Sequence, residues 1–481
     1  MTMAAPQRDL TTGPIGRTLL LFALPTLGSN ILQSLNGSIN AIWVGHYLGE
    51  SALAATANAN ILMFLMFGAV FGFGMAATIL VGQAFGRRDL DAARRAFGSA
   101  VGLVVGTATI AAVLGWVFAP EILRLLATPG DAFPLALAYL RVIFLGLPPS
   151  MLLVLLFMGL RGTGDANTPL WFIALSVVID SGLNPLLIDG IGPFPRLGIA
   201  GSALATFIAN LVAVTALVAY IYRRDLPLRL RGAELHYLLP ERALTRTIVA
   251  KGVPMGAQMI VISSAALAMV GLVNRQGVDT AAAYGVAQQL WAYIQMPALA
   301  IGAAVSAMAA QNIGAGRWDR VARITNAGLL INLALTGTMV ALTTLFDRAV
   351  LGLFLTDHGA AMAVAERIQL IGAWSFILFG AMMVYFSVVR ANGAVLVPLA
   401  ILFVSVYPIR IGFALGALPA IGSDALWWSF PVGSVATLGL SAAYYYFGNW
   451  RAIRMGRPPH DPHGETAHAD AEPAGRLHPT G

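Results

Sequence analysis

The 481-residue chain has no cysteine, a single lysine (Lys251) and few charged residues of any kind. Without cysteine it has no disulfide, no thiolate nucleophile and no cysteine-ligated metal site. Only 11% of its residues are charged, against roughly 25% in an ordinary soluble domain. In contrast, 58% are apolar, which is more than a soluble domain hides from water. This composition indicates a protein that is surrounded by lipid.

The formal net charge of +7 does not indicate a nucleic-acid-binding protein. The arginines lie mostly between long apolar runs, as they do in the loops of membrane proteins. If the N terminus is cytoplasmic, most loop arginines lie on the cytoplasmic side. The loops on the other side contain only Arg124, Arg196, Arg275 and Arg348. This asymmetry predicts a multi-pass protein of the inner cell membrane with both termini in the cytoplasm.

Twelve apolar runs are near or above the roughly 20 residues that a spanning helix needs. We therefore predict an all-α membrane protein with twelve transmembrane helices. The first six runs cover about 18–44, 53–83, 95–118, 134–160, 169–189 and 197–222. The second six cover about 247–273, 281–311, 324–346, 361–389, 396–418 and 425–449.

These runs divide the chain into five parts. We predict an N-terminal cytoplasmic segment at 1–17, a first lobe at 18–222, a cytoplasmic linker at 223–246, a second lobe at 247–449 and a disordered cytoplasmic tail at 450–481. The linker is the most polar internal stretch. The tail is rich in proline, histidine and glycine, a composition that buries too little apolar surface to fold alone.

The two lobes repeat each other in sequence. Matching residues recur at offsets of 228 or 229 positions: Pro25 with Pro254, Gln83 with Gln311, Gly86 with Gly314, Arg161 with Arg390, and Pro169 with Pro398. Each half has an even number of crossings, so the two halves are parallel repeats. In transporters built this way the substrate site lies between the halves, near the bilayer midplane.

Several short motifs occur in a recognisable order along the chain. The runs 81–89 (VGQAFGRRD) and 311–316 (QNIGAG) resemble the loops after helices 2 and 8 of the MATE (multidrug and toxic compound extrusion) family, and its DinF-like branch most closely. The segment 161–169 (RGTGDANTP) resembles the loop before helix 5, and 197–206 (LGIAGSALAT) resembles the start of helix 6. Residues 44–49 (VGHYLG) resemble the end of helix 1.

This resemblance implies two V-shaped lobes and an antiporter rather than an enzyme. The implied function is export of small organic compounds, often cationic or amphiphilic, driven by a proton or sodium gradient. We expect no cofactor apart from that transported ion, no nucleic-acid partner, and a monomer in the bilayer.

Asp180 is the acid that lies deepest in a predicted span. It follows Pro169 by eleven residues, which is about 16 Å along a helix in a core roughly 30 Å thick. A carboxyl group at this depth is costly to keep charged, so it is a candidate for binding and releasing protons. The alternative is a structural acid that is hydrogen-bonded between helices.

The residues around Asp180 differ from the family pattern. Helix 5 of the DinF-like branch often has an amide four residues before an acid, whereas this chain has Asp180 four residues before Asn184. Where helix 1 of the family usually has an acid, this chain has Asn40, which does not titrate. We therefore predict that Asp180 is the cation-coupling residue. Its expected partners are Asn184, Asn40, Asn36 and Thr206.

A substrate cavity between the lobes needs adaptable apolar and amide side chains. We expect eight residues to line it: Gln33, Gln258, Gln288, Gln289, Met63, Phe67, Trp291 and Tyr385. Helices 7 and 10 have no deep acid of the kind that some sodium-driven relatives use, so protons are favoured over sodium.

Two other functions fit parts of the sequence. A lipid-linked oligosaccharide flippase of the same superfamily would share the repeat, but would often have extra helices and a strongly cationic cavity. A membrane-embedded enzyme would need clustered acids or histidines, and His46, His236 and His358 are far apart. Twelve spans and few buried cations favour the exporter.

Overall fold

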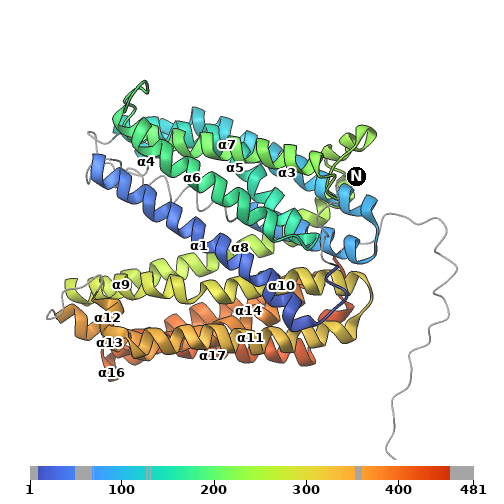
Figure 1. Ribbon diagram of the computed structural model, residues 1–481. Helices are drawn as coiled ribbons and strands as arrows, with labels where there is room; N and C mark the ends of the chain where they lie inside the picture. Colours follow the sequence, from blue (N-terminus) through green and yellow to red (C-terminus); the bar gives the residue numbers. More distant parts are fainter. Residues whose placement is uncertain are drawn as a thin grey trace, which may run out of the picture.

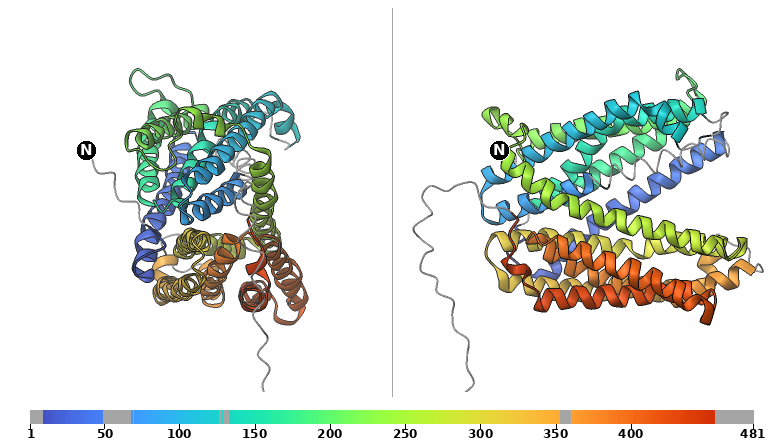
Figure 2. Two further views of the ribbon diagram at one scale, coloured as in Figure 1. Left: turned by 90° about the vertical axis from the view of Figure 1, so that its right-hand side faces the viewer. Right: turned by 180° about the vertical axis from the view of Figure 1, so that it is seen from behind.

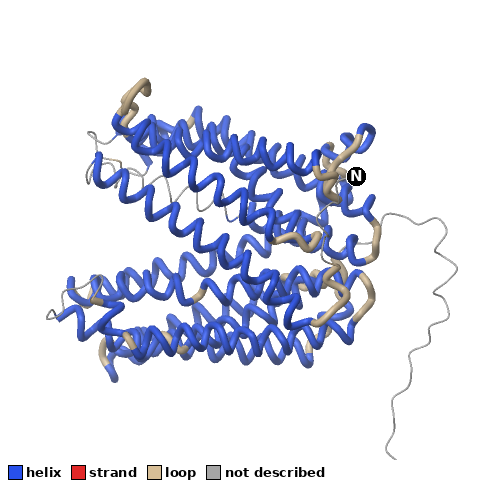
Figure 3. The backbone as a smooth tube through the Cα atoms, in the orientation of Figure 1, coloured by secondary structure: helices blue, strands red, loops and turns tan. Residues whose placement is uncertain are grey.

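The computed structural model describes residues 9–48, 68, 70–125, 128, 133–352 and 360–455. Within these ranges the regular secondary structure is helical and contains no strand (Figure 3). Nine helical segments are long and apolar enough to cross a bilayer, and a bent pair, Ala361–Gly372 with Ser375–Ala391, makes a tenth. The shorter apolar helix Val70–Gly86 and the C-terminal helix Asp424–Phe447 correspond to the two remaining predicted spans. The all-α, two-lobe prediction is confirmed.

The first lobe contains the first six predicted spans. Its helices are α1 (Ile15–Leu48), Val70–Gly86, α3 (Leu90–Val117), the short α4 (Ala119–Leu125), α5 (Phe133–Gly162), α6 (Asn167–Asp189) and α7 (Ile199–Arg223). Met63 and Phe67, two predicted cavity residues, lie outside the described residues.

The second lobe repeats this order with more interruptions. Its helices are α8 (Arg242–Asn274), α9 (Val278–Ile294), α10 (Met296–Gly314), α11 (Trp318–Leu345), α12 (Asp347–Leu351), α13 (Ala360–Gly372), α14 (Ser375–Ala391), α15 (Leu396–Val404), η2 (Ser405–Ile411), α16 (Gly412–Ile421) and α17 (Asp424–Phe447). The π-helical segment η2 contains Pro408, whose missing N–H removes one backbone hydrogen bond. A π turn takes more residues than an α turn, so η2 shifts the register of the eleventh span.

The lobes lie side by side and diverge toward one end (Figure 1). We call the end with the described N terminus the closed end and the opposite end the open end. Helix α1 packs against α10 of the second lobe and against α6 of its own lobe. Its counterpart α8 contacts α3 of the first lobe and α9 of its own, so the first helix of each repeat crosses between the lobes (Figure 2).

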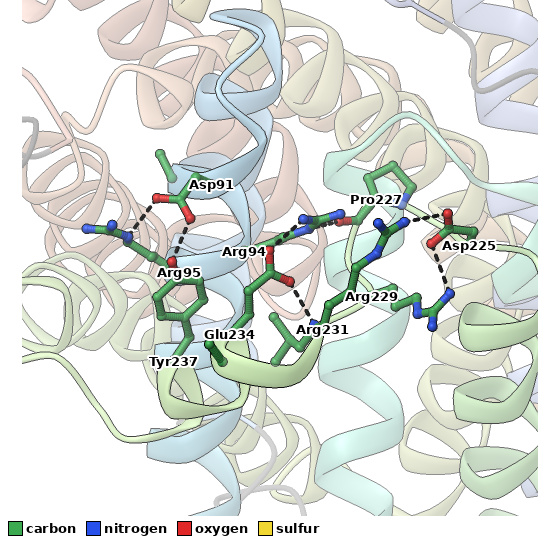
Figure 4. Close-up of polar contacts among 12 residues, drawn as sticks. Asp91, Arg94, Arg95, Asp225, Pro227, Arg229, Arg231, Glu234 and Tyr237 are labelled. Carbon is green, nitrogen blue, oxygen red and sulfur yellow. Dashed lines mark hydrogen bonds and ion pairs between the residues drawn. The ribbon is translucent and has the colours of Figure 1, made fainter.

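The linker between the lobes is folded against the first lobe. Its short 3₁₀ helix η1 (Gly232–Leu238) packs on α3, where the carbonyl oxygens of Tyr237 and Leu238 approach Gly98 and Gly102 so closely that a Cβ atom would clash. The Arg94 guanidinium donates to Glu234 and to the Pro227 carbonyl, and Tyr237 donates to Asp91 (Figure 4). The linker therefore extends the first lobe.

Charged pairs also fix the start of this linker. Arg231 donates to Asp225 over 2.5 Å and Arg229 donates to it over 3.2 Å (Figure 4). The hydrogen bond from Arg231 is the main reason why the pKa of Asp225 lies below its ordinary value. Asp225 has a positive φ of 52°, which turns the chain away from α7.

The chain after α17 is ordered for longer than we predicted. The 3₁₀ segment η3 (Trp450–Ala452) follows α17, and the Trp450 and Met455 side chains are buried. Asn392 donates to the Trp450 carbonyl over 2.9 Å. Residues 450–455 are thus part of the second lobe, because an indole packs there against Tyr445. The rest of the predicted tail, 456–481, lies outside the described residues.

Candidate functional site

Asp180 lies inside the first lobe, where α6 packs against α1 and α7. Its side chain is 1% exposed and that of Asn184, one turn later, is fully buried. The position of α6 is fixed at its start, where Asp165 accepts hydrogen bonds from the backbone N–H groups of Asn167 and Thr168. Because α6 begins there, Asp180 falls near the middle of the span.

All four predicted partners bond to the Asp180 carboxylate. Its Oδ2 accepts from the Asn36 Nδ2 at 2.8 Å and the Asn40 Nδ2 at 3.0 Å. Its Oδ1 accepts from the Asn184 Nδ2 and the Thr206 Oγ1, both at 3.0 Å. The Asn184 amide also donates to the Asn40 Oδ1 at 2.9 Å. Side chains from α1, α6 and α7 thus meet at one carboxylate, which the structure brings together as the sequence predicted.

The arrangement leaves the Asp180 charge without a counter-ion among the described residues. No arginine, lysine or histidine forms an ion pair with it there. Four neutral donors satisfy the two carboxylate oxygens, but they supply no full positive charge. The amide oxygens of Asn36 and Asn184 are buried, and no group in the described ranges forms a hydrogen bond to them. A proton or a small hard cation bound here would neutralise the carboxylate, and these oxygens would accept from or coordinate it.

The closed end joins the lobes through matching residues of the two repeats. Gln83 donates from Nε2 to the Ala391 carbonyl over 2.7 Å, and Gln311 donates from Nε2 to the Gly162 carbonyl over 2.9 Å. A Cβ atom at Gly86 would lie 1.9 Å from the Gln311 carbonyl oxygen. One at Gly314 would lie 2.0 Å from the Gln83 carbonyl oxygen. These residues recur at the repeat offset, so the contact is reciprocal.

Three of the predicted cavity residues, Trp291, Tyr385 and Gln258, are buried in the second lobe, and their role in substrate binding stays a prediction. Trp291 is 3% exposed, packs against Phe376 and Phe430, and donates its indole N–H to Gln369. Tyr385 is 7% exposed and packs against Tyr445 and Tyr446. Gln258 is 4% exposed and accepts from the Arg390 guanidinium.

The other described cavity candidates are accessible. Gln33 lies one turn before Asn36 on α1 and is exposed, Gln289 on α9 is exposed, and Gln288 is half-buried. Their role in substrate binding stays a prediction, as it does for Met63 and Phe67. Arg410, for which no role was predicted, lines a cavity in the second lobe.

Comparison with known proteins connects this geometry to a family. The family model MatE matches residues 25–186 and 254–415, so the second match begins 229 residues after the first. The chain is 34% identical over 435 residues to the probable multidrug resistance protein YoeA of Bacillus subtilis, covering 90% of this chain and 94% of that protein. It is 27% identical over 351 residues to a FAD transporter of Shewanella oneidensis, covering 73% and 77%.

Solved structures share the fold. One is described as the outward-facing conformation of a multidrug resistance MATE family transporter of the MOP superfamily. It superposes with a TM-score of 0.84 at 18% sequence identity and covers 92% of this chain and 98% of that chain.

Proposed function

Because the chain belongs to the MatE family of multi-pass membrane transporters, we propose that it is an antiporter that exports small amphiphilic organic compounds, cationic ones included, in exchange for protons. The observation that carries this proposal is the Asp180 carboxylate, which is buried within a spanning helix, held by four neutral donors and unpaired with any described cation. The names of the relatives support organic small molecules as the substrates.

The geometry of this site suits neutralisation of the Asp180 carboxylate by a bound proton. An uncompensated carboxylate in a span is unfavourable, so binding of a proton stabilises it and its release regenerates the charge. The membrane potential adds about 2.3 kcal/mol per charge per 100 mV to inward proton movement. Helix α1 links this step to both lobes, since its Asn36 and Asn40 donate hydrogen bonds to Asp180 and α1 also packs on α10 of the second lobe.

We further propose alternating access in the inner membrane, with the closed end toward the cytoplasm. In this orientation the loop arginines face the cytoplasm, in keeping with the positive-inside rule. The reciprocal contact of Gln83 and Gln311 is the seam that opens when the site turns inward. In a parallel repeat this movement is a rocking of one lobe against the other.

Sodium is the alternative coupling ion, favoured by the oxygen atoms around Asp180. The amide oxygens of Asn36 and Asn184, which have no hydrogen-bond partner in the part of the chain that the structure describes, and the carboxylate are ligands that a hard cation accepts. Transport driven by a sodium gradient, with the same pH on both sides of the membrane, distinguishes sodium coupling from proton coupling.

The test is transport in proteoliposomes that contain the purified protein and the fluorescent cation ethidium. A pH gradient without sodium, and a sodium gradient without a pH difference, are imposed separately. We expect the pH gradient alone to drive ethidium movement, and Asp180→Asn to reduce it to the rate of protein-free vesicles. Asp189→Asn is the matched control, because Asp189 lies at the end of α6, far along the helix from the site, and pairs with Arg196.

Two results would overturn parts of the proposal. Movement driven by sodium but not by protons would replace the proton by sodium. Full pH-driven movement in Asp180→Asn, with Asp189→Asn equally active, would remove Asp180 from the coupling step.

A further inference from the structure

A cavity in the second lobe is lined by a half-buried arginine, Arg410, at mid-membrane depth. Residues of α8, α14, α15 and α17 and of the π segment η2 line a space of about 100 Å³ that is open on one side. Arg410 lies 14 residues after the start of α15, which is about 21 Å along a 26-residue segment roughly 39 Å long. The remaining lining is mixed, with apolar residues such as Ala265 and Phe430 and the hydroxyls of Ser405 and Ser434.

Arg410 has no anionic partner within the described parts of the chain. Its guanidinium lies 3.7 Å from the centroid of the Phe430 ring, and no hydrogen bond or ion pair joins it to another described residue. The acids of the neighbouring helices α13 and α17, Glu366 and Asp424, pair with Arg348 and Arg367. A cation–π contact offsets only part of the cost of removing a guanidinium from water.

The packing holds the Arg410 side chain in this position. A Cβ atom at Gly433 would lie 3.0 Å from the Arg410 Cβ and 3.2 Å from its Cδ, so the glycine makes room for the arginine stem. The Ser405 hydroxyl lines the same cavity and is buried without a hydrogen-bond partner among the described residues. Two unsatisfied donors, one of them charged, therefore border one space.

The sequence repeat relates residues of this cavity to residues of the Asp180 site. The offset of 229 relates Asn36 on α1 to Ala265 on α8, and would relate Asp180 on α6 to residue 409. Arg410 lies one residue beyond that position, within the π segment η2, where a shift of register is expected, so it is the nearest charged counterpart of Asp180 in the repeat. Helix α17, which contributes Ser434, is the sixth helix of its repeat, as α7 with Thr206 is of the first.

We propose that the Arg410 cavity is an anion-binding site that receives the carboxylate or phosphate group of a transported amphiphile. The planar guanidinium can donate two parallel hydrogen bonds to such a group, and the Ser405 hydroxyl can donate a third. Zwitterionic and acidic amphiphiles are then substrates beside purely cationic ones. The proposal that the bound anion is part of a transported compound rests on the proposed function. The proposal that the cavity binds an anion is independent of it.

Binding is tested on purified protein in nanodiscs of zwitterionic phosphatidylcholine, with benzoate as the probe in isothermal titration and no ion gradient. We expect one benzoate per chain, an affinity at least about tenfold weaker in Arg410→Gln, and partial retention in Arg410→Lys. Arg275→Gln, the same change in an exposed loop arginine at the end of α8, should bind as the natural chain does. Nanodiscs that contain anionic phosphatidylglycerol form a second arm, in which weaker benzoate binding identifies a lipid headgroup as a competing occupant.

A cavity-filling variant keeps the test decisive if Arg410→Gln does not fold. Ala265→Leu places a larger side chain in the cavity without changing the charge, and should weaken benzoate binding by a similar factor. Absence of benzoate binding to the natural chain, or undiminished binding in both Arg410→Gln and Ala265→Leu, would overturn the anion site.

Transport of a matched pair of dyes tests whether the anion belongs to a substrate. Rhodamine 6G is a cationic ester and rhodamine 19 is its zwitterionic free acid, so the two differ by one carboxylate. We expect Arg410→Gln to slow rhodamine 19 efflux about tenfold relative to rhodamine 6G efflux. If Arg410→Gln weakens benzoate binding but slows both dyes equally, the anion that binds at this site is not part of a transported compound. Failure of both dyes to move in the natural chain would count against the proposed function instead.

Discussion

The two lobes contain opposite charges at corresponding depths, and they hold them differently. In the first lobe, Asp180 has four hydrogen-bond donors and is almost completely buried. In the second lobe, Arg410 has one aromatic ring and an open cavity. A carboxylate enclosed by donors suits a proton or a small cation. A guanidinium beside empty space suits a larger group with its own charge.

At the closed end, in contrast, the two repeats have the same residues and make the same contacts. Gln83 and Gln311 make equivalent hydrogen bonds to the opposite lobe, and Gly86 and Gly314 admit equivalent backbone contacts. Each residue at the contact between the lobes must fit the surface of the opposite lobe, so a change in one repeat requires a matching change in the other. A side chain that packs only within its own lobe does not have this requirement.

The largest expected difference between the two charged sites is in stability. Asp180→Leu leaves the amides of Asn36, Asn40 and Asn184 without their carboxylate acceptor, at about 1–3 kcal/mol for each donor that finds no other partner. Arg410→Met loses a cation–π contact of about 0.5–2 kcal/mol and removes an unpaired charge.

We therefore expect Asp180→Leu to lower the free energy of unfolding by about 3 kcal/mol or more, and Arg410→Met to change it by about 1 kcal/mol or less. Thermal unfolding in detergent, followed by tryptophan fluorescence, measures both. Equal destabilisation by the two substitutions would mean that Arg410 has a structural partner.

The second prediction tests the symmetry of the closed end. Gly86→Val and Gly314→Val each insert a branched side chain within about 2 Å of a carbonyl oxygen of the opposite lobe. Both should separate the lobes at this end to the same extent. Since the natural chain has no cysteine, a cysteine introduced at the buried Ala310 is the sole thiol, and its maleimide labelling reports the opening.

We expect both valine variants to accelerate this labelling about tenfold, which corresponds to a weakening of the seam by about 1.4 kcal/mol. Gly106→Val is the control, because a Cβ atom there meets nothing within 4 Å. If one of the two variants labels no faster than the control, the seam is not reciprocal.

The Asp180 cluster was predictable because two simple regularities define it. Depth along a helix singles out Asp180, and helical spacing puts Asn184, and the pair Asn36 and Asn40, on shared faces. Thr206 came from the family resemblance, because a threonine in a span has no distinctive local pattern. The fold was predictable for a related reason, since the length of an apolar run is fixed by the thickness of the bilayer.

The cavity residues were harder to predict because apolar side chains cover both the lipid-facing and the core-facing surfaces of a spanning helix. Sequence periodicity therefore did not reveal that Trp291 and Tyr385 point into the second lobe. The Arg410 site was missed for another reason. A constant offset from Asp180 ends at Ile409, and the π segment that corrects the register has no simple sequence signature apart from Pro408.

A smaller effect is expected when the Asp180 site loses one of its four donors. Thr206→Val removes one hydrogen bond of about 1 kcal/mol, so pH-driven ethidium efflux should fall about fivefold while the protein stays folded. Thr215→Val on the same helix is the control, because the Thr215 hydroxyl donates to the backbone of its own helix at an exposed position. Unchanged efflux in Thr206→Val would remove Thr206 from the cation-coupling set.

The smallest expected effect concerns the linker, which also distinguishes the two lobes. Arg94 on α3 holds the linker through Glu234 and the Pro227 carbonyl, at 2.8 and 2.9 Å. On α11, the corresponding helix of the second lobe, Arg323 pairs with Asp319 of the same helix, and no hydrogen bond or ion pair among the described residues joins it to the linker. Partly exposed pairs of this kind contribute about 1 kcal/mol or less.

Arg94→Ala should therefore raise the rate of tryptic cleavage after Arg229 and Arg231 by up to about fivefold, whereas Arg323→Ala should leave that rate unchanged. An equal increase in both variants would mean that the linker opens with the whole protein, and that it is not held by the first lobe alone.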